Sequence, residues 1–189
     1  MRIAYLDCAS GISGDMTLGA LVDAGVELEA IQAGISSLGI DGLRLVTSEV
    51  KKKGFRATQL TVEHQPEHAH RHLHHVVEII ESSDMTPSQQ ELAKRVFGKV
   101  AEAEAKVHGT TIEKVHFHEV GAIDSIADIC GAAIGWDLLG VDRIVCSAVP
   151  TGHGAVMIAH GKCSITAPAT GEMLKGITLA QSHTEGELT

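Results

Sequence analysis

The sequence predicts a single α/β domain, with α+β as the alternative, in which a mixed sheet is flanked by helices. Short apolar segments of strand character alternate along the chain with segments in which apolar residues recur at helical spacing. The 189 residues are 44% hydrophobic but only 3% aromatic, and 20 of them are glycine. We therefore expect an aliphatic core with many tight turns. No repeat or clear linker divides residues 1–189.

The strand and helix segments follow one another in a defined order. Strands are predicted at 2–6, 43–50 and 55–63, and helices at 16–24 and 27–38. The lysines at 51–53 read as a solvated hairpin tip. A helix begins near Leu73, and a long one runs from Pro87 to Val107. In the second half we expect a strand at 115–120 and a helix that ends at Gly140. A strand at 143–147 and a further strand that ends at residue 158 follow. The last predicted elements are a helix that starts near Pro168 and a strand at 177–180.

Charge and cysteine usage exclude several classes of protein. The formal net charge is −9, so nucleic-acid binding through a basic surface is excluded. Four cysteines lie far apart without a CxxC spacing, which is typical of reduced, mostly buried thiols in a cytoplasmic protein. There is no signal-peptide pattern and no run that approaches a membrane span.

The segment VHFHEVGAIDSIADICG, residues 115–131, concentrates residues that bind metals. On a strand, His116 and His118 point the same way, and on a helix Asp124 and Asp128 share one face. Imidazoles and carboxylates brought to one turn can hold one metal ion. In the simpler interpretation, Asp124 only caps its helix and the histidines are ordinary half-buried residues.

A strand, a Gly/Ser loop and a helix follow one another at 2–24, and this order can direct backbone N–H groups and a helix N-terminus at an anion. Neither a Walker A motif nor a dinucleotide fingerprint is present. Asp7 and Asp15 flank the loop and are suited to a cation. Alternatively, Ser13 or Asp15 is simply the helix N-cap.

Histidine is unusually frequent, with 12 residues, and half of them lie between His64 and His75. We expect this tract to be a mobile loop that binds nickel, copper or zinc through imidazoles. The alternative is a polar surface loop without a ligand.

Four stretches of the chain resemble the N-terminal region of the LarC family: DCASGISGDM, HAHRHL, VHFHEVGAIDSIADICG, and VPTGHGAVMIAHG followed by APAT. The resemblance implies an enzyme, a nickel-insertion cyclometallase of the lyase or chelatase class. It inserts nickel into pyridinium-3,5-bisthiocarboxylic acid mononucleotide to form the nickel-pincer cofactor of lactate racemase. CTP is consumed with Mg or Mn. The family's prolines after Gly161 are replaced here by Ser164 and Thr166.

As a hypothesis, we expect a division of labour among the candidate residues. A nickel-capturing set comprises His68, His70 and His72, and a transfer site comprises His116, His118 and Glu119. Asp7, Asp15, Asp124 and Asp128 complete that site or bind a second divalent ion. Glu119 and Asp124 are the candidate catalytic carboxylates, with Glu119 as proton acceptor. A phosphate cradle is formed by Ser10, Gly11, Ser13, Gly14 and Asp15.

The expected partners are the mononucleotide substrate, a C-terminal nucleotide-binding domain of the same protein, the lactate racemase maturation proteins and further copies in a homo-oligomer. We expect no membrane partner. The fragment alone is expected to be incomplete as an enzyme. Two other functions are compatible with the same residues: a nickel storage or delivery module, and a divalent-metal-dependent phosphate hydrolase.

Overall fold

The computed structural model describes residues 1–65, 71–115, 117, 122–158 and 161–188. Within these residues the helices are α1 (Gly14–Asp23), α2 (Leu28–Ser36), α3 (Leu73–Glu81), α4 (Pro87–Val107), α5 (Ile123–Leu139) and α6 (Pro168–Met173). The predicted class, a mixed α/β domain, is confirmed. Residues 66–70 of the His-rich tract that was predicted to be mobile lie outside the described residues, whereas its last residues, from Leu73 on, belong to α3.

The strands pair two by two. Parallel pairs join β1 (Ile3–Leu6) to β4 (Arg143–Cys146) and β5 (Val149–Pro150) to β9 (Leu179–Ala180). Antiparallel pairs join β2 (Arg44–Lys52) to β3 (Phe55–Glu63), β6 (Gly152–His153) to β10 (Gly186–Glu187), and β7 (Ala155–Ile158) to β8 (Gly161–Ser164). The described residues therefore form five two-stranded sheets, and the expectation of one continuous mixed sheet is wrong.

Helix α1 covers one edge of the largest hairpin, the β2–β3 pair. A Cβ atom on Gly19 of α1 would lie 2.8 Å from the carbonyl oxygen of Thr58 in β3. Because α1 packs this closely against the outer edge of β3, no further strand can pair there.

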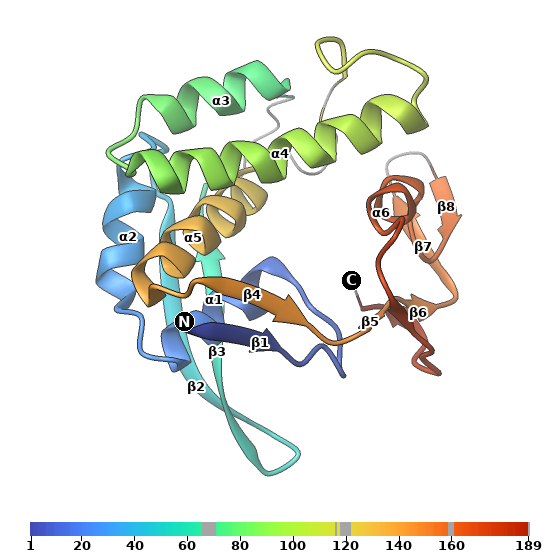
Figure 1. Ribbon diagram of the computed structural model, residues 1–189, viewed down its shortest axis with the longest axis horizontal. Helices are drawn as coiled ribbons and strands as arrows, with labels where there is room; N and C mark the ends of the chain where they lie inside the picture. The colour runs from blue at the N-terminus through green and yellow to red at the C-terminus, as the bar shows by residue number, and fades with distance from the viewer. Residues whose placement is uncertain (66–70, 116, 118–121, 159–160, 189) are drawn as a thin grey trace.

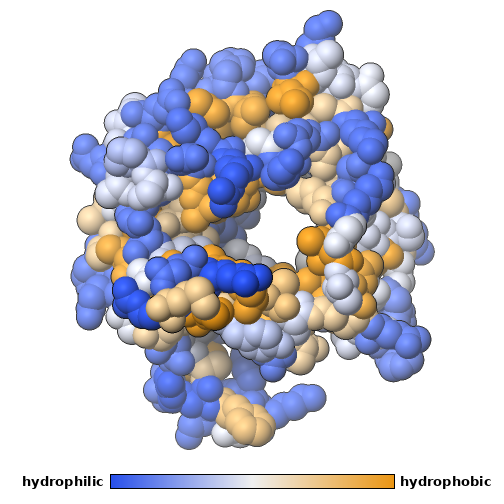
Figure 2. All heavy atoms as spheres, in the orientation of Figure 1, coloured by the Kyte–Doolittle hydropathy of each residue, from blue (hydrophilic) through white to orange (hydrophobic). Residues whose placement is uncertain are grey.

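Figure 1 shows a helical part, with α1 to α5 and the β2–β3 hairpin, beside a smaller C-terminal part with α6 and the short strands. Helix α4 runs from the helical part to the C-terminal part and contacts α6, where Lys106 pairs with Glu172. Figure 2 shows an opening between the two parts, bounded in this view by α4 above and by β1 and β4 below.

The core of the helical part is aliphatic, as the composition predicts, and α5 lies at its centre. Small residues on α5 let the neighbouring helices approach: a Cβ atom on Gly131 would lie 2.9 Å from a Leu18 methyl, and one on Gly135 would lie 2.6 Å from a Leu21 methyl. The largest fully buried side chains are Phe97, Phe117, Leu18, Leu21, Ile31, Ile35, Ile80, Ile126, Val76, Cys8 and Cys130.

Helix ends follow the predicted signals closely. Helix α4 begins at Pro87 behind a capping box, in which Thr86 accepts from the Gln89 N–H group and Gln89 accepts from the Thr86 N–H group. Helix α5 ends at Gly140, whose φ of 63° is the left-handed conformation typical of a C-terminal cap. The β2–β3 turn is Lys53–Gly54, so Lys51 and Lys52 belong to the strand and not to the tip.

The C-terminal part is attached to the loop that precedes α1. The Ile12 N–H group donates to the Leu188 carbonyl at 2.9 Å, and the Leu188 N–H group donates to the Thr151 carbonyl at 3.2 Å. Gly11 has a φ of 100°, and a Cβ atom there would lie 2.3 Å from the Leu188 oxygen. Only glycine fits this close crossing.

All four cysteines are free, in agreement with the prediction of reduced thiols. Cys8 and Cys130 are buried, and burial raises the pKa of the Cys130 thiol to about 12. The expectation that most are buried is only half met, because Cys146 is exposed and Cys163 is partly exposed. No described helix is both long and apolar enough to cross a membrane.

Candidate functional site

Three predicted carboxylates lie at the neighbouring N-termini of two helices. Asp15 is in the first turn of α1, Asp124 is in the first turn of α5, and Asp128 follows one turn later. The prediction of a shared helix face for Asp124 and Asp128 is consistent with α5, which spans both. We call Asp15, Asp124 and Asp128 the carboxylate cluster. The N-terminal ends of helices stabilise negative charge, which favours carboxylates at these positions.

Within this cluster, Asp128 is the carboxylate whose charged form is most strongly disfavoured by its surroundings. Burial raises its pKa to about 6, and the negative charges of Asp15 and Asp124 raise it further in the same direction. Among the described residues, its buried Oδ1 atom has no hydrogen-bond partner. A Cβ atom on Gly14 would lie 2.3 Å from its Oδ2 atom. A carboxylate that is desolvated, crowded by like charges and short of donors is suited to a cation.

The loop before α1 uses much of its own hydrogen-bonding capacity. Its Gly11 N–H group donates to the Cys8 carbonyl at 2.9 Å, and the Met16 N–H group donates to Asp15 Oδ1 at 2.8 Å. Ser13 is the N-cap of α1 and accepts from Met16 at 3.4 Å, as the simpler interpretation predicted. Ser10, Ser13 and Asp15 are exposed, and Asp7 Oδ1 accepts from the Ala9 N–H group at 3.3 Å.

The hydrogen bonds of the loop before α1 leave few backbone N–H groups for the predicted phosphate cradle. The N–H groups of Gly11, Ile12 and Met16 are occupied, and the carboxylate cluster surrounds the helix start. The occupied donors disfavour a phosphate at the N-terminus of α1, and the carboxylates favour a cation there. The phosphate role of this loop stays a prediction.

The end of the histidine tract lies beside the start of the segment 115–131. The Phe117 N–H group donates to the Arg71 carbonyl at 3.1 Å, and the His72 Nδ1 atom lies 3.0 Å from the Val115 carbonyl. The tautomer with the proton on Nδ1 suits this contact, because a carbonyl can only accept, and it leaves the lone pair of the neutral ring on Nε2. Val115 and Phe117 are buried, with 2% and 1% of their surface exposed, and they anchor this contact.

Two further histidines of the predicted metal-binding tract, which were not among its selected ligands, lie at this place. The ring centroid of His72 lies 5.4 Å from that of His74 and 5.6 Å from that of His75, and those two are 3.9 Å apart. His75 also accepts from the His72 N–H group through Nδ1 at 3.2 Å, at the start of α3. The spacing of His72, His74 and His75 at i, i+2 and i+3 across the start of a helix is the sequence pattern from which their proximity could have been predicted.

Several predicted residues lie outside the described part of the chain: His68, His70, His116, His118 and Glu119. Among the residues that the structure describes, no group of three His, Cys, Asp or Glu side chains is arranged to hold a metal ion. The carboxylate cluster and the three rings at the start of α3 are therefore groupings of suitable ligand types rather than completed metal sites. The predicted strand at 115–120 is described only at Val115 and Phe117, where Phe117 forms an isolated bridge to Arg71.

Comparison with known proteins identifies the family. The nickel insertion protein family matches residues 4–189. The chain belongs to this family. A Rhodopirellula baltica protein named for nickel insertion is 55% identical over 189 residues, which is 100% of this chain and 48% of that protein. No solved structure matches the chain.

Other relatives carry a more specific name, pyridinium-3,5-bisthiocarboxylic acid mononucleotide nickel insertion protein. The one from Desulfitobacterium hafniense is 46% identical over 188 residues and the one from Geobacillus kaustophilus is 44% identical over 199 residues. In both cases 100% of this chain is covered, but only 47% and 48% of the relative. The chain therefore spans about half the length of the curated relatives it matches.

Proposed function

We propose that this chain is the nickel-handling part of a protein that inserts nickel into pyridinium-3,5-bisthiocarboxylic acid mononucleotide, forming the nickel-pincer cofactor of lactate racemase. Family membership and the names of the relatives support nickel and this mononucleotide as substrates. The structural observation that carries the proposal is the contact between Arg71–His72 and Val115–Phe117. It joins the histidine tract to the segment that leads into α5 and its two aspartates.

The two groups of ligands suit different steps. Imidazoles are good ligands for nickel, so His72, together with His68 and His70, would capture the ion. His116, His118 and the oxygen ligands Asp7, Asp15, Asp124 and Asp128 would hold it during transfer or bind a second divalent ion. Because the described side chains are not arranged as a completed site, binding would draw them together or recruit the residues at 116–121.

Forming a nickel–carbon bond on the pyridinium ring requires a base, because the ring carbon must lose its proton. If Asp128 does not ligate the metal, it suits this role, because burial raises its pKa to about 6 and it can then accept a proton near neutral pH. Glu119 and Asp124 remain the other candidates for this role. Nickel is a substrate throughout, bound in the product by the ring carbon and two sulfur atoms.

We assign the remaining requirements to parts of the protein beyond this chain. The chain spans about half of its relatives, and the LarC resemblance supports CTP with Mg or Mn bound by a C-terminal domain. The same resemblance supports a cytoplasmic homo-oligomer that works with the lactate racemase maturation proteins.

Nickel titration by calorimetry tests the proposal. We expect a site in the unmodified chain that is lost when His68, His70, His72 and His74 become alanine. We expect the affinity to fall at least ten-fold in the double variant Asp124→Asn, Asp128→Asn. His183→Ala, an exposed histidine of the C-terminal part, is the matched control and should bind normally.

Other outcomes separate the alternatives. A storage or delivery module would lose nickel stoichiometry only with the histidines and be indifferent to the aspartates. A metal-dependent phosphate hydrolase would release phosphate with Mg or Mn and lose this activity in the aspartate variant alone. A titration that is the same for all variants contradicts the proposal.

A further inference from the structure

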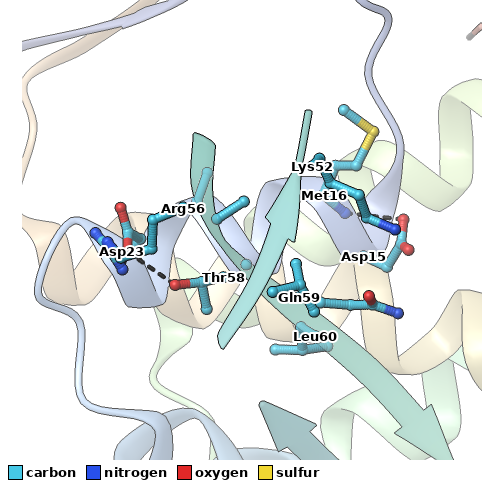
Figure 3. A pocket seen from close by; sticks show the side chains of 12 residues that line it. Asp15, Met16, Asp23, Lys52, Arg56, Thr58, Gln59 and Leu60 are labelled. Carbon is cyan, nitrogen blue, oxygen red and sulfur yellow. Dashed lines mark hydrogen bonds and ion pairs between the residues drawn. The ribbon is translucent and has the colours of Figure 1, made fainter. Parts of the chain in front are cut away.

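A groove of about 560 Å³ lies between α1 and the β2–β3 hairpin. Figure 3 shows its lining, which comes from three elements and consists of Asp15, Met16, Gly19, Ala20, Asp23, Val50, Lys52, Arg56, Ala57, Thr58, Gln59 and Leu60. Its volume is in the range of small-molecule sites. Asp15 belongs both to this groove and to the carboxylate cluster, so one end of the groove adjoins the cluster.

The walls of the groove are held in place by the close contact of α1 with β3. Gly19 meets the backbone of Thr58, and Asp23 accepts a hydrogen bond from Thr58 Oγ1 at 2.8 Å. Asp23 also pairs with Arg56 at 2.9 Å. These contacts connect the last turn of α1 to β3, so the groove is part of the packed fold and not a gap between independent segments.

Charged groups of both signs lie at its two ends. In Figure 3, Asp15 and Lys52 lie toward one end and Arg56 toward the other, beside Asp23. The Arg56–Asp23 pair involves one terminal nitrogen of the guanidinium, and that nitrogen also lies 4.0 Å from Glu49. An arginine has five N–H donors, so further donors are available to a ligand. Within the described part of the chain, the Lys52 ammonium has no ion-pair partner.

We infer that this groove binds the mononucleotide substrate, with the phosphate at Arg56 and the ring at the end formed by Asp15 and Lys52. The inference rests on the proposed function for the identity of the ligand. The ring of that mononucleotide is a pyridinium cation with anionic thiocarboxylates, so it complements a carboxylate beside an ammonium. Arginine is suited to the phosphate through parallel N–H donors.

This orientation places the metal-accepting end of the substrate beside the carboxylate cluster. Met16 and Ala20 of α1 offer an apolar wall for the ribose and the ring edge. Lys52 therefore lies in a binding site, although the sequence predicts that the lysines at 51–53 form a solvated hairpin tip. Lys53, in the turn, does not line the groove.

Nicotinic acid mononucleotide, a stable pyridinium carboxylate with a ribose phosphate, is the probe for this site, and binding is measured by calorimetry on the whole chain. Arg56→Gln should weaken binding at least ten-fold, since a charge-assisted contact to phosphate is lost. The same variant should leave binding of nicotinic acid riboside, which has no phosphate, unchanged. Lys52→Ala should reduce the preference for nicotinic acid mononucleotide over nicotinamide mononucleotide, because the ring carboxylate loses its ammonium.

Two substitutions test the location independently of charge. Ala20→Trp fills the groove from an exposed position of α1 and should abolish binding, whereas Ala30→Trp, on an exposed position of α2 outside the groove, should not. Lys53→Asn is the charge control, because residue 53 has a φ of 49°, a conformation that asparagine tolerates. Thermal unfolding of each variant verifies folding.

The outcomes distinguish this inference from the proposed function. Unchanged binding of nicotinic acid mononucleotide in both Ala20→Trp and Arg56→Gln overturns the groove as its site. The absence of any binding, with the nickel titration intact, overturns the inference and leaves nickel handling standing. Binding that depends on the groove in a chain that takes up no nickel retains the site and overturns the proposed function.

Discussion

The carboxyl group of Asp128 is held where its charge is disfavoured, and this is a property of a single residue in its surroundings. Burial and the neighbouring Asp15 and Asp124 raise its pKa to about 6 from 3.8. The folded chain therefore binds a proton more tightly than the unfolded chain does. This residue contributes stability below pH 4 that is lost as the pH rises through 6.

Asp128→Asn should stabilise the metal-free protein at neutral pH, because it removes a half-buried charge without changing the size of the side chain. We expect a gain of about 1 to 2 kcal/mol in the free energy of unfolding at pH 7.5, after allowing for solvent screening. No gain is expected at pH 3.5, where both forms are neutral. Urea unfolding in the presence of a chelator measures this. A loss of stability at both pH values would instead assign Asp128 a structural hydrogen bond.

At the residue scale, sequence spacing predicted part of the site. The four-residue spacing of Asp124 and Asp128 predicts their shared face, because it depends only on the helix. The approach of Asp15 and the contact between Gly14 and Asp128 depend on how α1 packs on α5, which no local pattern encodes. The predicted site residues 68, 70, 116, 118 and 119 lie outside the described residues.

Among the elements, both ends of α4 were predicted correctly, but the division of the strands into small sheets was not predicted. Pro87 and the Thr86–Gln89 capping box are local signals, and they set the start of α4. Strands β5, β6, β9 and β10 have two residues each, too few for an alternating pattern to be recognised. Their pairing is decided by contacts between distant segments, and α1 occupies the edge where the larger hairpin could have grown.

The contact between α1 and β3 predicts opposite effects for one substitution at two helical glycines. Gly98→Ala in α4 should stabilise by about 0.5 to 1 kcal/mol, because nothing lies within 4 Å of the new methyl group. Gly19→Ala should destabilise by about 1 to 3 kcal/mol, because its methyl would meet the Thr58 carbonyl at 2.8 Å. Thermal and urea unfolding measure both. Stabilisation by both variants would contradict the close packing of α1 on β3.

On the scale of the whole molecule, one crossing attaches the C-terminal part to the loop before α1. Gly11→Ala should break it, since its methyl would lie 2.3 Å from the Leu188 oxygen and its φ of 100° is unfavourable for alanine. We expect faster amide hydrogen exchange at Ile12 and Leu188 and little change in α4 and α5. Gly25→Ala is the matched control, with a φ of 101° and nothing within 4 Å. Equal effects of both variants would show that backbone strain alone is responsible.

The pairing of β1 with β4 has a consequence for how the protein reaches its native state. Residues 3–6 pair with residues 143–146, and α1 packs on α5, so the two ends of the helical part meet only after a long segment has been brought together. Closing so large a loop is entropically costly and slows the search for native contacts. During synthesis on the ribosome, β1 must wait without its partner until residue 146 has emerged. Through that interval the backbone N–H and C=O groups of residues 3–6 lack their strand partner and are available to chaperones.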